Sequence, residues 1–410
     1  MSMLFSSSSS RRHLLLHLRL LSSFATPLPV LQGISISQAK ARLRSDQDPD
    51  KALAIISSVS DRLTDPVSSR YVLDLAVRRL AKSGRFSDIK TLIESQKSNP
   101  NFTQEPLIST LIIAYGRAGL PSGAIHTFRD MDRLGTSRSV VSFNALLTAW
   151  CEAKKFNQVP KLFAQTTKDY GIAPDKVSYG ILIKSLCQLG RLEKAISILN
   201  EMGEKGIGVT TPAYTTILDS LYKKRKVEDA ERIWNEMREK GCLPDVAAYN
   251  VKIMHAAFHE KPEQVLKLID EMASSGLKPD TISYNFLMTC YCKDGRMDDA
   301  MKVYLGLQEK GCKPNVATFR TLVHYLCENG DFDAGLEVFK ASALKRKVPD
   351  FGTTKSLLEG LVKTSNLKEA EKLIEYVKKR FPERYLNAWK KVEMELGFTD
   401  EGKGSAQEPA

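Results

Sequence analysis

The chain has 410 residues, of which 42% are hydrophobic and 26% are charged, and its formal net charge is +12 at neutral pH. This composition excludes an intrinsically disordered chain. The excess of cations predicts a polyanionic partner. The leucine-rich stretch near the N-terminus, RRHLLLHLRLL, is too short and too polar to cross a bilayer, and we expect no membrane partner.

The N-terminal segment lacks acidic residues, and the first one in the chain is Asp46. The same segment carries Arg11, Arg12 and Arg19 and a run of serines. This composition is typical of an organellar transit peptide, and the leucine-rich, arginine-bearing stretch favours mitochondria over plastids. We therefore expect residues 1–34, approximately, to be a mitochondrial transit peptide and the mature protein to act in the matrix.

Residues 36–69 predict a degenerate helix pair, whose apolar positions are Ala52, Leu53, Ile55 and Ile56. A fixed period follows. An aromatic residue recurs at steps of 36 residues once and 35 residues four times, at Phe143, Tyr179, Tyr214, Tyr249, Tyr284 and Phe319. Two further series keep the same register, namely Gly206, Gly241, Gly276 and Gly311, and Pro244, Pro279, Pro314 and Pro349. Three features locked to one period indicate a helical solenoid.

Each repeat predicts two helices joined as a hairpin. In the unit 281–315, Tyr284, Leu287, Met288 and Tyr291 form a stripe at helical spacing, and Gly311 ends the second helix. About nine units fill residues 70–385, and they run 70–104, 105–139, 140–175, 176–210, 211–245, 246–280, 281–315, 316–350 and 351–385. No stretch has the alternation of a strand. We expect an all-α fold, a right-handed α-solenoid of stacked helix-turn-helix repeats.

After the repeats, residues 386–398 predict a C-terminal capping helix, and residues 399–410 predict a disordered tail. The chain lacks a CxxC pair, and six of its seven cysteines recur at two positions of the repeat, which predicts buried thiols. His255 and His259 have a helical i, i+4 spacing but lack a third ligand, so we expect no metal site. We also expect no cofactor, no small-molecule substrate and no enzymatic activity, because glycine-rich phosphate loops and nucleophile elbows are absent.

The repeat unit resembles the pentatricopeptide repeat, in its plain 35-residue class (P class). The residues that carry the resemblance are VSFNALLTAWCEAKKF at 141–156, PAYTTILDSLYKKRKVEDA at 212–230 and ISYNFLMTCYCKDGRMDDA at 282–300, with the closing segments EMREKGCLPD and EMASSGLKPD. The resemblance covers roughly residues 70–385. It implies binding of single-stranded RNA at about one base per repeat.

In the family, the residue after the aromatic position and the last residue of the unit hydrogen-bond the base edge. The resemblance therefore implies that Asn144 with Asp175 reads uracil, Thr215 with Asp245 guanine, Asn250 with Asp280 uracil, and Asn285 with Asn315 a pyrimidine. The second residue of each unit packs against the base plane, and Val141, Val177 and Ile282 occupy that position. Other units depart from this pattern and carry Ala247, Ala317 and Gly352 there.

Cations occupy two of the base-reading positions, at Arg320 and Lys355, where binding of phosphate is the better interpretation. Lys223, Lys293 and Lys363 recur every 70 residues at the end of the first helix and are further candidates for phosphate binding. The alternative for all five is an ordinary solvated surface charge. For the asparagines of the base-reading pairs, the alternative is a role as a helix N-cap or in a turn.

The layout resembles the short pentatricopeptide proteins that associate with plant mitochondrial ribosomes. The resemblance implies an RNA-binding adaptor of mitochondrial gene expression, with ribosomal or single-stranded RNA and mitochondrial ribosomal proteins as partners, acting in translation. One alternative is a factor for mRNA stability or processing that binds a short tract. Another is a protein scaffold without RNA binding.

Overall fold

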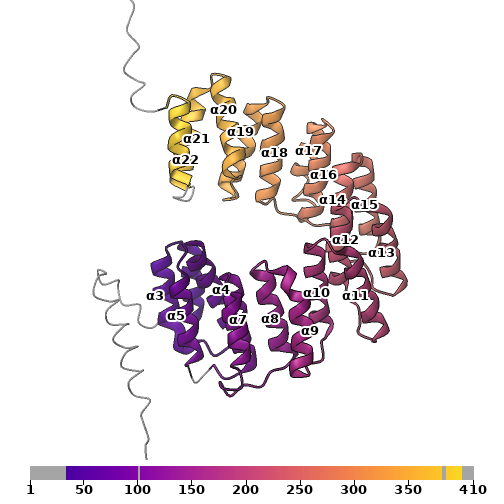
Figure 1. Ribbon diagram of the computed structural model, residues 1–410. Coiled ribbons are helices and arrows are strands. Elements are labelled where there is room, and N and C mark those ends of the chain that lie inside the picture. Colours follow the sequence, from indigo (N-terminus) through magenta and orange to yellow (C-terminus); the bar gives the residue numbers. More distant parts are fainter. Residues whose placement is uncertain (1–33, 100–101, 381–384, 399–410) are drawn as a thin grey trace, which may run out of the picture. The chain divides into compact units, whose positions relative to one another are not determined.

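The computed structural model describes residues 34–99, 102–380 and 385–398. Over these ranges the secondary structure is helical and contains no strand. The predicted transit peptide (except for its last residue) and the predicted tail lie outside the described residues. The chain divides into two compact units, residues 1–191 and 192–410, and within each unit the helices stand side by side as hairpins (Figure 1).

The first unit contains two starting helices followed by the first repeats. Its α-helices are α2 (Ile36–Ser45), α3 (Pro49–Val59), α4 (Pro66–Lys82), α5 (Phe86–Lys97), α6 (Glu105–Arg117), α7 (Pro121–Arg129), α8 (Val140–Glu152), α9 (Val159–Tyr170) and α10 (Lys176–Gln188). Two short 3-10 helices, η1 (Ser60–Arg62) and η2 (Phe156–Gln158), precede α4 and α9. The first helices of successive repeats, α4, α6, α8 and α10, contact one another in order.

The second unit continues the same pattern. Its helices are α11 (Leu192–Glu204), α12 (Thr211–Lys223), α13 (Val227–Glu239), α14 (Val246–His259), α15 (Pro262–Ser274), α16 (Thr281–Lys293), α17 (Met297–Leu305), α18 (Val316–Glu328), α19 (Phe332–Leu344), α20 (Phe351–Lys363), α21 (Leu367–Arg380) and α22 (Leu386–Glu395). Here α12, α14, α16, α18 and α20 form the row of first helices. All described helices are too short or too polar to span a membrane.

The last residue of one repeat caps the first helix of the next. The side chain of Asp280 accepts hydrogen bonds from the backbone N–H groups of Ile282 and Ser283, which start α16. Asp175, Asp245, Asn315 and Asp350 cap their helices in the same way. A side-chain oxygen at this position satisfies backbone donors that have no partner inside the helix. These caps therefore place α10, α14, α16, α18 and α20 at the first residue of their units.

The second helices of several repeats end at a glycine in the left-handed region. Gly241 and Gly276 have φ angles of 71° and 78°, which a residue with a Cβ atom adopts at a cost.

The first helix of the repeat array begins earlier than the 35-residue spacing predicts. It begins at Pro66 instead of residue 70, because Asp65 provides the cap and Pro66 fits the first turn of the helix.

The recurring aromatic residues connect neighbouring repeats. Tyr249 on α14 packs edge-on against Trp234 on α13 of the preceding repeat, with ring centroids 5.1 Å apart. Phe319 on α18 meets Tyr304 on α17 in the same way, at 6.0 Å. Such rings bury a large apolar area at the junction. The 35-residue period of aromatic residues is thus the period of the inter-repeat contact.

Ion pairs also link consecutive repeats. Lys226 pairs with Glu193 at 2.9 Å, and both Lys261–Asp294 and Arg296–Glu263 pair at 2.6 Å. Each of these pairs joins residues 33 positions apart, which is about one repeat. Exposed pairs of this kind add little stability individually. These pairs neutralise many surface charges, so the cations that lack such partners are the better candidates for binding an anion.

Candidate nucleic-acid interface

Three of the four predicted base-reading pairs are in direct contact. The side-chain Nδ2 of Asn144 donates to Oδ1 of Asp175 at 3.1 Å, and Asn250 donates to Asp280 at the same distance. Asn285 donates to Oδ1 of Asn315 at 3.2 Å. The first member lies in the first helix of one repeat, and the second is the N-cap of the following first helix. Stacking of consecutive hairpins therefore brings together residues that are about thirty positions apart in the chain.

A hydroxyl group completes each of these three pairs. The hydroxyls of Ser178, Ser283 and Thr318 donate to the amide oxygens of the three asparagines at 2.6, 2.6 and 2.7 Å. Sequence reasoning missed these residues. The available signal was a small hydroxyl residue directly before the recurring aromatic residue. Because a hydroxyl donates to the amide oxygen, the amide NH2 group must face the carboxylate or carbonyl partner.

This arrangement leaves specific groups available to a ligand. In the described part of the chain, every protein hydrogen bond to the Asp280 side chain ends on Oδ1, which leaves Oδ2 as an acceptor. The same holds for Asp175. Asn250 has two N–H donors and uses one of them on Asp280. The pair thus offers one donor and one acceptor side by side, which complements an edge such as that of uracil.

In the Asn144–Asp175 pair, the surroundings of the carboxylate favour its charged form. Burial alone would raise the pKa of Asp175. Hydrogen bonds from the backbone and hydroxyl of Ser178 and from the Asn144 amide outweigh burial, and the pKa of Asp175 stays below its ordinary value. The acceptor is therefore ionised at neutral pH and does not compete as a donor.

The fourth predicted pair is not joined. The hydroxyl of Thr215 donates to the backbone oxygen of Thr211 at 2.9 Å, one turn back in its own helix. Asp245 accepts from the backbone N–H of Ala248 at 2.9 Å. Ala248 occupies the position where the other three pairs have a hydroxyl residue, so this pair also lacks the hydroxyl group that completes the others.

Exposed apolar side chains lie beside the contacting pairs. Val141, Val177 and Ile282 are 46%, 50% and 46% exposed, although large aliphatic residues in helices usually face the core. Asn144 and the two valines line one groove of about 370 Å³ in the first unit. Ile282, Asn285 and Asn315 line another groove, of about 540 Å³, in the second unit. Candidate base-reading residues and exposed apolar side chains therefore line the same two grooves.

Three of the five predicted phosphate ligands already have partners in the chain. Lys223 pairs with Asp219 at 2.6 Å. Lys293 donates to the backbone oxygen of Phe258 at 2.8 Å, and its ammonium lies 4.9 Å from the centre of that ring.

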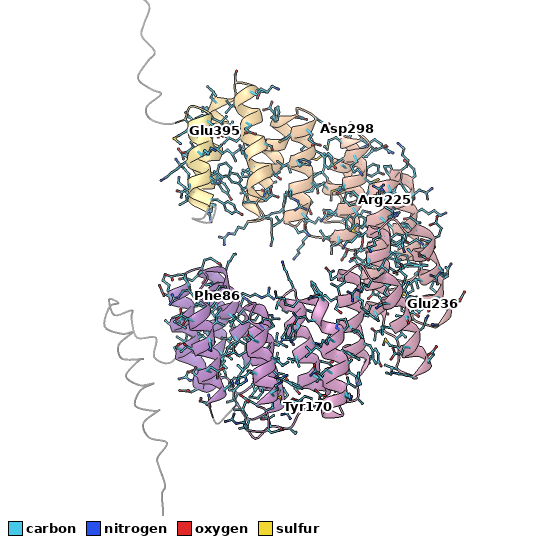
Figure 2. The ribbon with its side chains drawn as sticks, viewed as in Figure 1. Phe86, Tyr170, Arg225, Glu236, Asp298 and Glu395 are labelled. Carbon is cyan, nitrogen blue, oxygen red and sulfur yellow. The ribbon has the colours of Figure 1, made fainter. Side chains whose placement is uncertain are left out.

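Lys355 is held between two carboxylates, Glu359 at 3.4 Å and Glu395 at 3.8 Å. Glu395, labelled in Figure 2, belongs to the C-terminal helix α22. Arg320 and Lys363 are exposed and form no ion pair with any residue that the structure describes. These two are the cations of the set that remain open to an anion.

Metal chemistry finds no support in the described ranges. They contain no group of three or more His, Cys, Asp or Glu side chains that could bind a metal ion. The rings of His255 and His259 lie 4.7 Å apart, and burial together with the neighbouring His259 lowers the pKa of His255. All seven cysteines are free. Burial raises the pKa of Cys292 to about 12, so its thiol is unreactive at neutral pH.

Comparison with known families assigns the repeats. The family model described as PPR repeat family matches residues 138–188, 209–254 and 279–328. A second one, described as PPR repeat, matches residues 109–136, 177–207 and 317–341. Together these segments cover about half of the chain. The chain belongs to the pentatricopeptide repeat (PPR) family. The resemblance carried by the repeat motifs is thereby confirmed.

Two Arabidopsis thaliana proteins are markedly similar to this PPR chain. It is 54% identical over 189 residues to "Small ribosomal subunit protein mL103 (rPPR7)", which is 46% of either chain. It is 51% identical over 203 residues to a pentatricopeptide repeat-containing protein described as mitochondrial, over 48% of this chain and 49% of that one. The chain thus spans about half the length of the curated relatives that it matches.

A solved structure confirms the fold class. The pentatricopeptide repeat protein PPR10 in complex with an 18-nt psaJ RNA element matches with a TM-score of 0.52 and 20% identity, over 97% of this chain and 57% of that one. At this level of identity the match supports the architecture of the PPR array. The expected all-α solenoid of hairpin repeats is therefore correct.

Proposed function

We propose that this PPR protein is an RNA-binding adaptor of mitochondrial gene expression that associates with the mitochondrial ribosome and acts in translation in the matrix. The observation that carries RNA binding is the set of hydrogen-bonded Asn–Asp and Asn–Asn pairs, of which Asn144 and the Asn285–Asn315 pair line grooves with exposed aliphatic side chains. Fixed donors and acceptors next to an apolar surface suit unstacked bases of single-stranded RNA.

Ribosome association is supported by the similarity to small-subunit proteins. Besides mL103, the Arabidopsis protein named "Small ribosomal subunit protein mS78 (rPPR3a)" is 38% identical over 136 residues, which is 33% of this chain. The basic net charge agrees with a ribosomal RNA partner, because polyanions attract a chain with excess cations. We infer no catalytic role for this array.

Co-sedimentation tests this function. The full-length tagged protein is expressed in plant mitochondria, and the lysate is separated on a density gradient before and after nuclease digestion of messenger RNA. We expect the protein in the small-subunit fraction under both conditions. A shift to light fractions after digestion would indicate a message-binding stability or processing factor. Association with proteins, combined with no RNA affinity at low salt, would indicate a scaffold.

The base-reading pairs give a prediction for specificity. Asn250→Thr converts the Asn–Asp combination with Asp280 into the Thr–Asp combination that the family resemblance links to guanine. We expect the preference at one RNA position to change from uracil to guanine by about tenfold. Fluorescence anisotropy with RNAs that differ at a single base measures the change.

The matched control is Asn235→Thr, the same substitution at an exposed position of the second helix α13. It should leave every affinity unaltered. If Asn250→Thr weakens binding to all RNAs equally, Asn250 contributes to stability but does not read a base.

A further inference from the structure

The turn after the second helix of the repeat 316–350 differs from the turns of the repeats before it. In each of the six preceding repeats this turn contains a glycine in the left-handed region. These glycines are Gly135, Gly171, Gly206, Gly241, Gly276 and Gly311. Arg346 follows Gly311 by 35 residues and takes the same position, with a φ angle of 55°. A Cβ atom makes this conformation unfavourable, so the arginine is placed here at a cost.

The residues beside Arg346 also depart from the repeat pattern. Lys347 replaces an apolar residue or a cysteine, and Leu344 replaces a glutamate in three of the four preceding repeats. The replaced residues are Ile207, Cys242, Leu277 and Cys312 at the first position, and Glu204, Glu239 and Glu309 at the second. With Lys345, this turn carries three consecutive cations and no acid, whereas the same four positions are neutral in each of those repeats.

The backbone of this turn keeps the geometry of the others. The N–H of Lys347 donates to the carbonyl oxygen of Ser342 at 2.9 Å, the same hydrogen bond that closes the earlier turns. The side chain at this position usually packs on the end of the helix, but Lys347 is exposed. Lys345 already supplies a cation at the C-terminal end of the helix, where positive charge is favourable. The structure of the turn therefore requires neither Arg346 nor Lys347, and residues that break a local rule in this way point to a function.

The end of the next second helix adds to this charge. Phe339 on α19 packs edge-on against Tyr376 on α21, with ring centroids 5.8 Å apart, so the two helices lie side by side. Beyond this contact α19 leads into the turn 345–347, and α21 ends with the exposed cations Lys379 and Arg380. We call these five residues the basic edge, namely Lys345, Arg346, Lys347, Lys379 and Arg380.

The basic edge is open to an anion. Lys379 lies 3.6 Å from Glu375, and the other four cations form no ion pair within the described part of the chain. All five lie outside the grooves that contain the base-reading residues. The turn and the last turn of α21 carry no exposed aromatic side chain, and their one large exposed apolar residue is Leu344. Unstacked bases would find little to stack on, so this surface suits phosphates of RNA whose bases are already paired.

We propose that the basic edge binds the phosphate backbone of a double-helical RNA segment, separately from the base-reading grooves. An RNA helix hides its base edges in a narrow major groove and is recognised mainly through its phosphates and 2′-hydroxyls. The guanidinium of Arg346 binds a phosphate through two parallel hydrogen bonds, and the neighbouring lysines add charge. The inference rests on the proposed function, because folded ribosomal RNA supplies such helical segments. It gives the array a second contact with RNA that requires no particular base sequence.

The test measures binding of the full-length chain to an RNA hairpin with a stem of about sixteen base pairs, over a range of salt concentrations. The variant Arg346→Gly/Lys347→Ile introduces the residues that the repeat 176–210 has at these positions. We expect its affinity for the hairpin to fall by about tenfold, and the slope of log affinity against log salt to become shallower by about 2, as for two phosphate contacts. Its melting temperature should stay the same or rise, because glycine fits the left-handed position. Loss of binding without loss of stability distinguishes a ligand contact from a structural role.

Two further variants complete the design. Lys345→Gln/Arg380→Gln leaves the left-handed residue of the turn unchanged and should weaken binding of the hairpin by a similar factor. It decides the question if the first variant melts at a lower temperature than the wild type. Lys194→Gln/Lys267→Gln is the control, because it removes the same charge from exposed positions of α11 and α15 that form no ion pair with the described residues. This control should keep the wild-type slope.

The outcomes separate this inference from the proposed function. If both variants of the basic edge bind the hairpin as the control does, the inference is wrong, while binding of single strands by the reading pairs stands. An equal loss for the hairpin and for a single strand of roughly twelve nucleotides overturns the preference for a helix. Loss of binding to phosphatidylglycerol vesicles, with the hairpin still bound, identifies a lipid surface instead. Failure of the wild-type protein to bind either RNA at low salt overturns the inference and the proposed function together.

Discussion

Gly116→Ala is expected to destabilise the first unit by about 3 kcal/mol. A Cβ atom at residue 116 on α6 would lie 2.3 Å from the Cα atom and 2.4 Å from the backbone oxygen of Ala149 on α8. Both of these are backbone atoms, so no change of rotamer relieves the overlap. The two helices would have to move apart, and the core between them, which includes Ile112 and Leu146, would lose contact. Denaturant unfolding followed by circular dichroism measures the loss.

The control for this variant is Gly180→Ala on α10, another glycine within a helix of the same unit. Apart from its chain neighbours and the nearby backbone of its own helix, no heavy atom lies within 4 Å of the position that its Cβ would take. Alanine is the better helix former, so we expect a stabilisation of about 0.5–1 kcal/mol. If both substitutions have the same effect, the close approach of α6 and α8 does not limit packing in this unit.

Trp389→Ala is expected to have the second large effect, a local loss of about 3–5 kcal/mol in the last repeat. Trp389 on α22 is 1% exposed, and its ring meets Phe351 on α20 edge-on at 4.6 Å. The helix is tied further by Lys378, which pairs with the buried Glu393 at 2.7 Å. Because stability in a solenoid depends mainly on neighbouring repeats, the loss should stay near the C-terminal end. Hydrogen exchange should accelerate in α20–α22 and remain unchanged in α12–α16.

Met394→Ala in the same helix is the matched control, because Met394 is 63% exposed. Its removal should change neither the exchange rates nor the melting curve measurably. A uniform acceleration across the second unit in Trp389→Ala would contradict a local capping role. It would mean instead that the unit unfolds as one cooperative body.

The candidate reading residues also hold the repeats together. Asn250 and Asn285 are each only 8% exposed, and each forms two side-chain hydrogen bonds, one to the last residue of its own repeat and one to a hydroxyl in the next repeat. Removing such a side chain leaves a buried hydroxyl with fewer partners, at a cost of about 1–3 kcal/mol. Variants at these positions therefore require both a stability measurement and an affinity measurement.

Some parts of the site were predictable from the sequence and others were not. The asparagines and their partners were found because the family resemblance assigns them to fixed positions of the repeat. The hydroxyls of Ser178 and Ser283 were missed, since their role depends on contact with a different repeat. Lys355, in contrast, was singled out by the sequence but has partners that the sequence did not indicate. Its position predicts an open cation, but Glu395 of the C-terminal helix α22 lies beside it in the fold.

By itself the sequence determined the repeat length, the helix pairs, the family and the positions of Asn144, Asn250 and Asn285. These properties follow from local signals, namely apolar spacing within a helix, capping residues and helix-ending glycines. The tertiary structure alone decided that Thr215 turns to its own helix, that Gly116 touches Ala149, and that Arg320 lines the same groove as Phe258 and Phe286. The physical reason is that the Gly116 contact and the lining of the groove join residues of different helices. For Thr215, a partner in its own helix competes with a partner in another repeat for one hydroxyl group. These contacts depend on how closely neighbouring hairpins stack, and no local pattern specifies that distance.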